Sequence, residues 1–196
     1  MQQVIEALKA GQPVLLATDT VYGVAAIAGS KGCEEIYRLK QRPAGQALPW
    51  LVLGADCLGV WANNVPDYAR ELARAFWPGA MTLIVNASPA ALDRGVHKNG
   101  TVALRVPDDE TCLRLLNALD APLCCTSANV HGKPAPTRLE DVDKRFLSLA
   151  HSANLARRCP GRQASTIVDC TGSRLQIVRD GALTEQIKQH LSLHYC

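Results

Sequence analysis

Two basic residues, Lys40 and Arg42, lie two positions apart where a helix predicted over 31–40 ends. Pro43 follows them and moves Arg42 from a helical towards an extended conformation. The two cations can then converge on one polyanion, with Lys40 supplying a point charge and Arg42 a planar fork for phosphate oxygens. Basic residues at a helix C-terminus also match the helix dipole. Spacing alone leaves both interpretations open.

Polar side chains follow an apolar stretch where a strand predicted over 122–125 ends. Ser127 and Asn129 are two positions apart, so strand alternation puts both side chains on one side. There they can hold a phosphate or the edge of a base. Turn chemistry is the alternative, because Ser and Asn favour turns. Thr18 and Thr20 also share a side, and helix capping or an ST-turn is their alternative.

A cation interrupts another apolar strand, where Arg105 follows the run 102–104. A guanidinium in such a strand needs a partner. A salt bridge is the structural explanation and a carboxylate ligand the functional one, and the sequence leaves both open. Arg179 is a further isolated cation at a predicted strand end.

Standard nucleotide and metal motifs are absent from this sequence. It contains neither G-x-x-x-x-G-K-[ST] nor G-x-G-x-x-G, and no H-E-x-x-H, G-x-S-x-G or EF-hand loop. Any phosphate must therefore be held without a standard loop, and no protein-held metal site is predicted.

Strands and helices intermix along the chain and must position these groups. This arrangement favours an α/β or α+β class with a mixed sheet. Asp108 is the predicted N-cap of its helix. No repeat or linker divides the chain, so one domain over 1–196 is expected. Periodicity and turn residues predict strands at 14–17, 21–27, 50–53, 81–85, 101–106, 122–125, 166–169 and 175–179, and helices before Gly11 and at 31–40, 66–76, 108–119, 139–149 and 182–191.

The composition is that of an ordinary globular protein. The 196 residues are 47% hydrophobic and 20% charged, which excludes a disordered chain. A net charge of +3 excludes a dominant nucleic-acid surface and leaves room only for a local patch. The eight cysteines form no C-x-x-C and are expected to be reduced core thiols. Without a signal peptide or a membrane-length apolar run, we expect a soluble cytoplasmic protein.

Six segments together resemble the YrdC family, the threonylcarbamoyl-AMP synthases. The family pattern reads approximately P-T-[DE]-T-x-Y-G-L, K-x-R-P, T-x-A-x-R-x-P, S-A-N, S-T-x-x-D and R-x-G. Each motif is weak alone, but six in one order are specific. The corresponding segments here are 18–24, 40–43, 101–107, 127–129, 165–169 and 179–181.

The resemblance implies a YrdC-like twisted open mixed sheet with flanking helices and a large concave cavity. It implies a reaction in which ATP, L-threonine and bicarbonate or CO2 give L-threonylcarbamoyl-adenylate and pyrophosphate. The product serves N6-threonylcarbamoyl modification of adenosine 37 in tRNA. Mg²⁺ accompanies ATP, and no permanently bound cofactor is implied. Similarity to the short bacterial type implies separate transfer proteins as partners, and binding of tRNA or double-stranded RNA is associated with the family.

The resemblance also assigns site residues by motif position. Lys40 and Arg42 neutralise the phosphates and are the expected catalytic pair. The expected ATP contacts are Lys40, Arg42, Gln46, Thr101, Ser127, Asn129 and Arg179, and the expected L-threonine contacts are Thr20, Arg105, Cys125 and Ser165.

The chain departs from the family pattern at several positions. Leu51 stands where many members carry a threonine-contacting His, and Gln46 stands where an Asn often contacts ATP. Two alternatives to the synthase are a paralogue of the same fold without this activity and a module that binds double-stranded RNA or tRNA.

Overall fold

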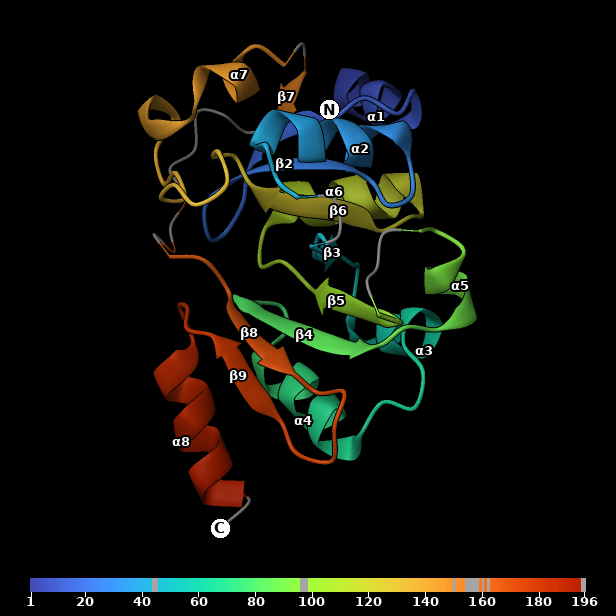
Figure 1. The fold of residues 1–196 in the computed structure, drawn as a ribbon, viewed down its shortest axis with the longest axis vertical. Coiled ribbons are helices and arrows are strands. Elements are labelled where there is room, and N and C mark those ends of the chain that lie inside the picture. Colours follow the sequence, from blue (N-terminus) through green and yellow to red (C-terminus); the bar gives the residue numbers. More distant parts are fainter. Residues whose placement is uncertain are drawn as a thin grey trace.

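One twisted sheet forms the frame of the molecule (Figure 1). The computed structural model describes residues 1–43, 46–95, 99–149, 151–153, 159, 161 and 163–194. In these ranges, nine strands pair in the order β7-β1-β2-β6-β3-β5-β4-β8-β9. The strands are β1 Val14–Ala17, β2 Tyr22–Ile27, β3 Trp50–Leu51, β4 Met81–Asn86, β5 Thr101–Arg105, β6 Leu123–Ser127, β7 Ser152–Ala153, β8 Thr166–Asp169 and β9 Gln176–Arg179.

The sheet is mixed, as the sequence predicted. The pairs β1–β7, β3–β5 and β4–β8 are parallel, and the other neighbours are antiparallel. Strand β3 has only two residues, yet it pairs with both β6 and β5 and so joins the two halves of the sheet. The expectation of one domain over 1–196 stays a prediction.

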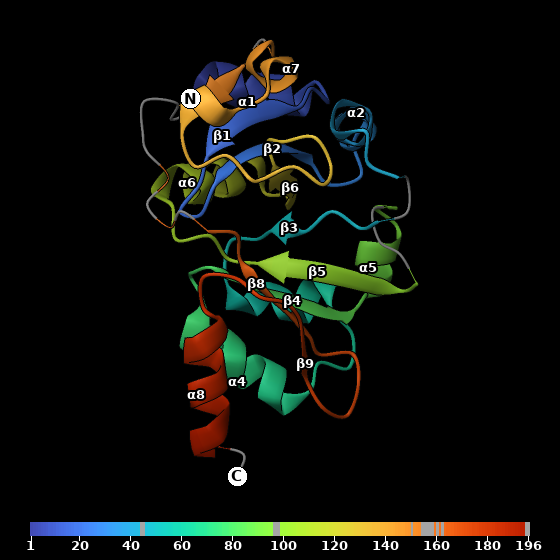
Figure 2. The same ribbon diagram turned by 60° about the vertical axis from the view of Figure 1, so that its left-hand side comes forward.

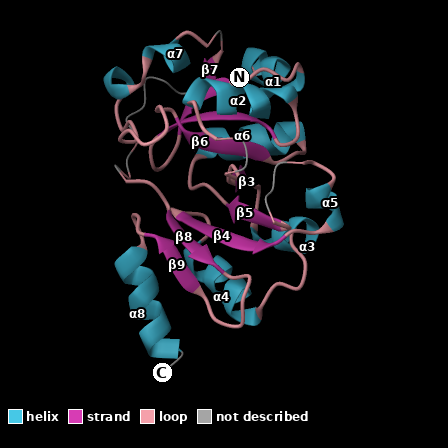
Figure 3. Ribbon diagram, viewed as in Figure 1, coloured by secondary structure: helices cyan, strands magenta, loops and turns pink. Residues whose placement is uncertain are grey.

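Helices cover both faces of the sheet (Figures 2 and 3). Apolar residues of α1 and α6 pack on one face of β1, β2 and β6, and α2 packs on the other face. The helices α4 and α8 lie beside the β4-β8-β9 end (Figure 1). The helices are α1 Gln2–Lys9, α2 Lys31–Lys40, α3 Leu58–Trp61, α4 Asp67–Phe76, α5 Pro89–Leu92, α6 Glu110–Leu119, α7 Lys144–Leu147 and α8 Thr184–His194, with 3-10 turns at Ala55–Cys57 and Leu139–Asp141.

Two helix predictions were wrong in detail. The N-cap of α6 is Asp109, whose carboxylate accepts a 2.9 Å hydrogen bond from the Cys112 N–H, whereas Asp108 is exposed. The helix predicted over 139–149 is a 3-10 turn followed by the short α7. Between them Val142 adopts an extended conformation that buries its side chain in the core, and Asp143 caps the new helix.

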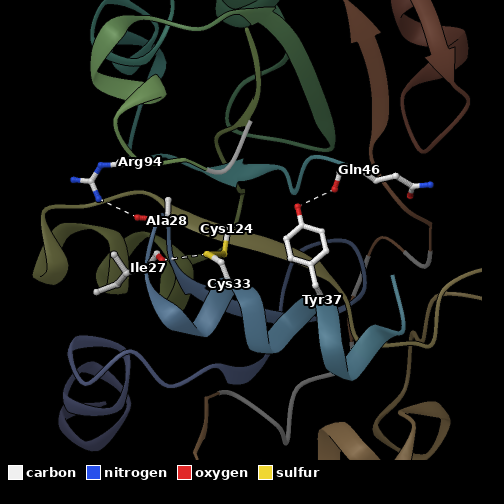
Figure 4. Close-up of a disulfide and its surroundings, with 7 residues drawn as sticks. All are labelled: Ile27, Ala28, Cys33, Tyr37, Gln46, Arg94 and Cys124. Carbon is white, nitrogen blue, oxygen red and sulfur yellow. Dashed lines mark hydrogen bonds between the residues drawn. A yellow bond between two sulfur atoms is a disulfide. The ribbon is translucent and has the colours of Figure 1, made fainter. Parts of the chain in front are cut away.

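The expectation of reduced thiols fails for one pair of cysteines. Cys33 of α2 and Cys124 of β6 form a disulfide, with Cα atoms 6.6 Å apart (Figure 4). Strand alternation turns Cys124 towards α2 and Cys125 towards the other face, so the pairing depends on a packing that sequence spacing does not reveal. Cys57, Cys112, Cys125, Cys159 and Cys170 are not part of a disulfide, and Cys196 lies outside the described residues. None of the described helices is long and apolar enough to cross a membrane.

Candidate functional site

A hollow lies across the middle strands of the sheet. Its volume is about 80 Å³. Since one water needs about 10–15 Å³ on this scale, the space holds about six water-sized groups, a size that suits a small amino acid. Neighbouring strands each contribute to the lining, through Gly23 of β2, Cys125 and Ser127 of β6, Leu51 of β3, Arg105 of β5, Thr82 of β4 and Arg179 of β9.

The end of β5 places a buried guanidinium at this hollow. Arg105 is 7% exposed and donates from three nitrogens to three acceptors. Its Nη2 meets Asp19 Oδ2 at 2.5 Å, its Nη1 meets Thr20 Oγ1 at 3.0 Å, and its Nε meets the Gly79 carbonyl oxygen at 2.9 Å. The salt bridge that the sequence analysis left open is therefore present, and it coexists with a place in the cavity wall.

The turn before β2 orients its two threonines by an internal hydrogen-bond relay. Thr18 Oγ1 donates to the Val21 carbonyl at 2.7 Å, so in the 3.0 Å contact between the two hydroxyls Thr20 must be the donor. Thr18 Oγ1 also accepts from the Thr20 and Val21 N–H groups, which is the ST-turn geometry weighed above. Both hydroxyls are buried, and both residues line the cavity.

A second hydroxyl cluster closes the opposite wall. Ser165 Oγ lies 2.8 Å from Thr82 Oγ1 and accepts a 3.0 Å hydrogen bond from Arg179 Nη2. Arg179 also donates to the Ser165 carbonyl from Nη2 and Nε. The turn after β9 packs closely on this cluster, and a Cβ on Gly181 would clash with the Ser165 carbonyl carbon. Thr82 was not predicted as a site residue.

Lys40 binds the segment that follows β6. Its side chain is 2% exposed, and its ammonium donates to the carbonyl oxygens of Ser127 at 2.5 Å and Asn129 at 2.8 Å. Asn129 Oδ1 is a third acceptor at 3.3 Å. Because an ammonium has three N–H donors, these contacts use all of them. The structure thus brings Lys40, Ser127 and Asn129 together, with Lys40 behind the polar segment.

Arg42 lies beyond the end of α2. It donates from Nε to the Gln46 carbonyl at 3.3 Å and from Nη2 to the Ala47 carbonyl at 3.0 Å. The Gln46 carbonyl also accepts from the Tyr37 hydroxyl at 2.9 Å (Figure 4). Gln46 itself is exposed.

Electrostatic interactions link the four cations. Burial, followed by repulsion from Arg42, lowers the pKa of Lys40 to about 8. Desolvation lowers the pKa of Arg179, and repulsion from Arg105 and Arg42 lowers it further. Each of the four cations therefore interacts electrostatically with at least one other, although they come from α2, the loop after it, β5 and β9. Such a concentration of positive charge suits a polyanion such as a triphosphate.

Two predicted residues differ from the rest in their surroundings. Cys125 lines the cavity, and burial raises the pKa of its thiol to about 12, so it is neither an anion nor a nucleophile near neutral pH. Thr101 lies at the other end of β5 from Arg105, roughly 13 Å away at ~3.3 Å per strand residue. Alternation nevertheless puts both on the same face of the sheet.

Metal ligands do not gather in this site. Within the described ranges, no group of three or more His, Cys, Asp or Glu side chains could hold a metal ion. A magnesium ion that arrives with a nucleotide would take its ligands chiefly from phosphates and water.

Comparisons with known proteins point to one family. The family Sua5_yciO_yrdC, described as "Telomere recombination", matches residues 6–181. A threonylcarbamoyl-AMP synthase of Bacillus subtilis is 31% identical over 185 residues, covering 91% of this chain and 52% of that protein. A relative from Mycobacterium tuberculosis is 36% identical over 199 residues, covering 96% of this chain and 88% of that protein.

Solved structures share the sheet. Pyrococcus abyssi Sua5 complexed with L-threonine superposes with a TM-score of 0.84 at 30% identity, over 96% of this chain and 56% of that one. Escherichia coli YciO superposes with a TM-score of 0.80 at 24% identity, over 91% and 87% of the two chains, and shows the fold alone. The chain thus spans little more than half of the Bacillus and Pyrococcus proteins. With a match over most of its sequence, several relatives above 30% identity and a common sheet, this chain belongs to the Sua5/YciO/YrdC family, which confirms the resemblance seen in its six motifs.

Proposed function

We propose that this chain is a threonylcarbamoyl-AMP synthase that joins L-threonine, bicarbonate or CO2, and magnesium-bound ATP. The products are L-threonylcarbamoyl-adenylate and pyrophosphate. The observation that carries the proposal is a group of four cations that interact electrostatically, of which Arg105 and Arg179 line a cavity that also contains hydroxyl groups. The name of the Bacillus relative and the L-threonine complex of the Pyrococcus protein support it.

The cavity suits the amino acid. The guanidinium of Arg105 would fork onto the L-threonine carboxylate, while Thr20, Ser165 and Cys125 enclose the rest of the molecule. The threonine amine then attacks the carboxyl carbon of bicarbonate, a C–N bond forms, and water leaves. Holding both reactants in this space supplies rate through orientation.

The cations suit the nucleotide. A carbamate oxygen attacks the α-phosphorus of ATP in line, and the bond from that phosphorus to the β-phosphate oxygen breaks. Arg42 and Arg179 would neutralise the departing pyrophosphate, together with the magnesium ion that accompanies ATP. Lys40 adds its charge from behind the Ser127–Asn129 segment, whose polar groups would contact the nucleotide. Gln46 and Thr101 are the outermost proposed ATP contacts.

Positioning and electrostatics supply the catalysis in this scheme, without a covalent intermediate. Cys125, whose thiol is part of the cavity wall, is protonated at neutral pH. We further propose that the adenylate is consumed in N6-threonylcarbamoylation of tRNA adenosine 37 by separate transfer proteins.

Pyrophosphate release tests the proposal. Release from ATP should require both L-threonine and bicarbonate, and mass spectrometry should detect the adenylate. Arg42→Ala should lower turnover by about 100-fold or more, as expected for loss of a charged group at a transferring phosphoryl. Arg38→Ala is the matched control, because Arg38 lies on α2, just before Arg42, with its side chain 74% exposed.

Three results would count against the synthase. The first is pyrophosphate release that does not require L-threonine, and the second is full activity of the Arg42→Ala variant. The third is binding of double-stranded RNA by a folded protein that shows no turnover. The last result would favour the RNA-binding alternative.

A further inference from the structure

We propose that Asp19 is a positioning residue, which holds the Arg105 guanidinium in the orientation that binds the carboxylate of the amino-acid substrate. This inference rests on the proposed function. It begins with the geometry of a buried ion pair, in which the Asp19 and Arg105 side chains are only 9% and 8% exposed.

The contacts of Arg105 leave a defined part of it free for a ligand. A guanidinium carries five N–H donors. One hydrogen on Nε, one on Nη1 and one on Nη2 go to Gly79, Thr20 and Asp19. One hydrogen on each terminal nitrogen remains, and Arg105 lines the cavity. Two N–H groups, one on each terminal nitrogen, are the number that a bidentate carboxylate contact uses.

Asp19 acts on this arrangement from outside the cavity. It is absent from the cavity wall, while its neighbours Thr18 and Thr20 are part of it. Its main chain is fixed from behind, because the Gly161 N–H donates to the Asp19 carbonyl at 2.9 Å. A Cβ on Gly161 would lie 2.6 Å from that oxygen, so the two segments are in close contact. Asp19 therefore reaches the substrate only through Arg105.

Charge gives Asp19 a second effect on the same group. Arg105 and Arg179 repel each other across the cavity. The Asp19 carboxylate offsets this repulsion at Arg105 and occupies only one N–H group, on Nη2. The surplus positive charge of Arg179 and Arg42 still attracts an incoming anion.

Asp19→Asn is an informative substitution, because one carboxylate oxygen of Asp19 has no hydrogen-bond partner among the described residues. Asp19 Oδ1 is buried and has no hydrogen-bond partner. In Asp19→Asn the NH2 group must either face Arg105, where donor meets donor, or take the position of Oδ1, and in both cases the negative charge opposite Arg105 is lost. Either orientation weakens the hold on Arg105 at nearly constant volume.

The test is a comparison of substrate constants in the complete chain. Asp19→Asn should raise the KM for L-threonine by about tenfold or more, the effect of losing a hydrogen bond between charged groups, and leave the KM for ATP within about twofold. L-Threonine should also no longer protect the Asp19→Asn variant against thermal unfolding. Asp109→Ala is the control, because it removes a buried aspartate that caps α6 and should lower stability with both KM values unchanged.

A double-mutant cycle keeps the inference falsifiable if Asp19→Asn alone fails to fold. Arg105→Gln with Asp19→Asn leaves no buried unpaired charge, and it should bind L-threonine no more weakly than Arg105→Gln alone. A further loss in the double variant, or an unchanged L-threonine KM in folded Asp19→Asn, would overturn the role of Asp19. If the wild-type chain neither releases pyrophosphate with L-threonine nor binds it, the proposed function itself fails.

Discussion

The buried charge of Lys40 should favour the binding of ATP and lower the stability of the fold. Its ammonium holds the carbonyl oxygens of Ser127 and Asn129 and so shapes the polar segment after β6. Burial and the nearby Arg42 lower its pKa to about 8, whereas an exposed lysine titrates near 10.5. Near pH 8 the residue therefore changes between a three-donor cation and a neutral amine.

Nucleotide affinity should consequently weaken as the pH rises through about 8. Deprotonation removes one positive charge from the site and one hydrogen from the contacts of Lys40. The measurement is the Kd for ATP between pH 7.5 and 9.5 without L-threonine, so that the substrate amine does not contribute. Lys40→Met should bind ATP weakly with a flat profile over this range. A flat profile in the wild-type chain would contradict the pKa assigned to Lys40.

The free energy of unfolding, in contrast to the affinity for ATP, should increase as the pH rises through about 8. Between pH 8 and about 10.5 the unfolded chain keeps the proton that the native chain has lost, so the unfolded state binds more protons. The contribution of Lys40 to stability is therefore least below pH 8 and increases as the pH rises through this window.

Residue types and spacing were enough to find most of these groups, but not their partners. The predicted convergence of Lys40 with Ser127 and Asn129 is observed as a set of contacts, whereas their roles toward ATP stay predictions. Asp19 sits inside a quoted motif, yet its pairing with Arg105 spans 86 positions of sequence. Nothing local distinguishes a carboxylate that pairs at such a distance from one that caps a turn.

At the scale of elements, the pairing of β2 with β6 depends on a missing side chain. Gly23 lies opposite Ser127, and a Cβ there would come within 2.9 Å of Cys125 Sγ and 3.3 Å of the Thr126 carbonyl oxygen. Both strands are fixed by pairing on their other sides, so neither can withdraw easily.

Gly23→Ala should therefore destabilise the fold by about 1–3 kcal/mol, the usual cost of overpacking a core. Chemical denaturation would measure the loss. Adding Cys125→Ala removes the closest clashing atom and should restore part of the stability, whereas Cys170→Ala, which empties a buried site on the other side of the core, should not. Equal stability of Gly23→Ala and the wild-type chain would show that the two strands separate more easily than their pairing indicates.

Elements built from apolar runs were predicted well, and elements defined by tertiary contact were not. Strands β1 and β8 and helix α2 have the predicted bounds, because their apolar patterns are strong and their ends carry turn residues. The strand predicted over 50–53 is present only as the two residues of β3, and the two-residue β7, which pairs with β1, was not predicted. The helix expected over 139–149 is interrupted because the core takes up Val142.

The whole molecule assembles its site from strands that are distant in sequence. The order β2-β6-β3-β5-β4-β8-β9 places Gly23 at one end of the hollow and Arg179 at the other. Sequence periodicity identifies strands but carries little information on which strands pair. The family resemblance supplied that order indirectly, since six motifs could be expected to share one site.

The disulfide ties two of these distant segments together. Cys33 and Cys124 are 91 positions apart, and they join α2, which ends in Lys40, to β6, which ends in Ser127 (Figure 4). The same two elements thus meet at two places, through a covalent bond and through the ammonium of Lys40. A cross-link that closes so long a loop restricts the unfolded chain strongly.

Opening this bond should lower the free energy of unfolding by about 2–4 kcal/mol, the range typical of disulfides. Urea denaturation with and without dithiothreitol measures the change, and Cys33→Ser with Cys124→Ser should reproduce it without reductant. Cys57→Ser is the control, because Cys57 is free and only partly buried. When the chain is unfolded without reductant, it should also show two fewer titratable thiols than when it is unfolded after reduction. Equal thiol counts would mean that the two sulfurs are close but not bonded, and stability would then be indifferent to the reductant.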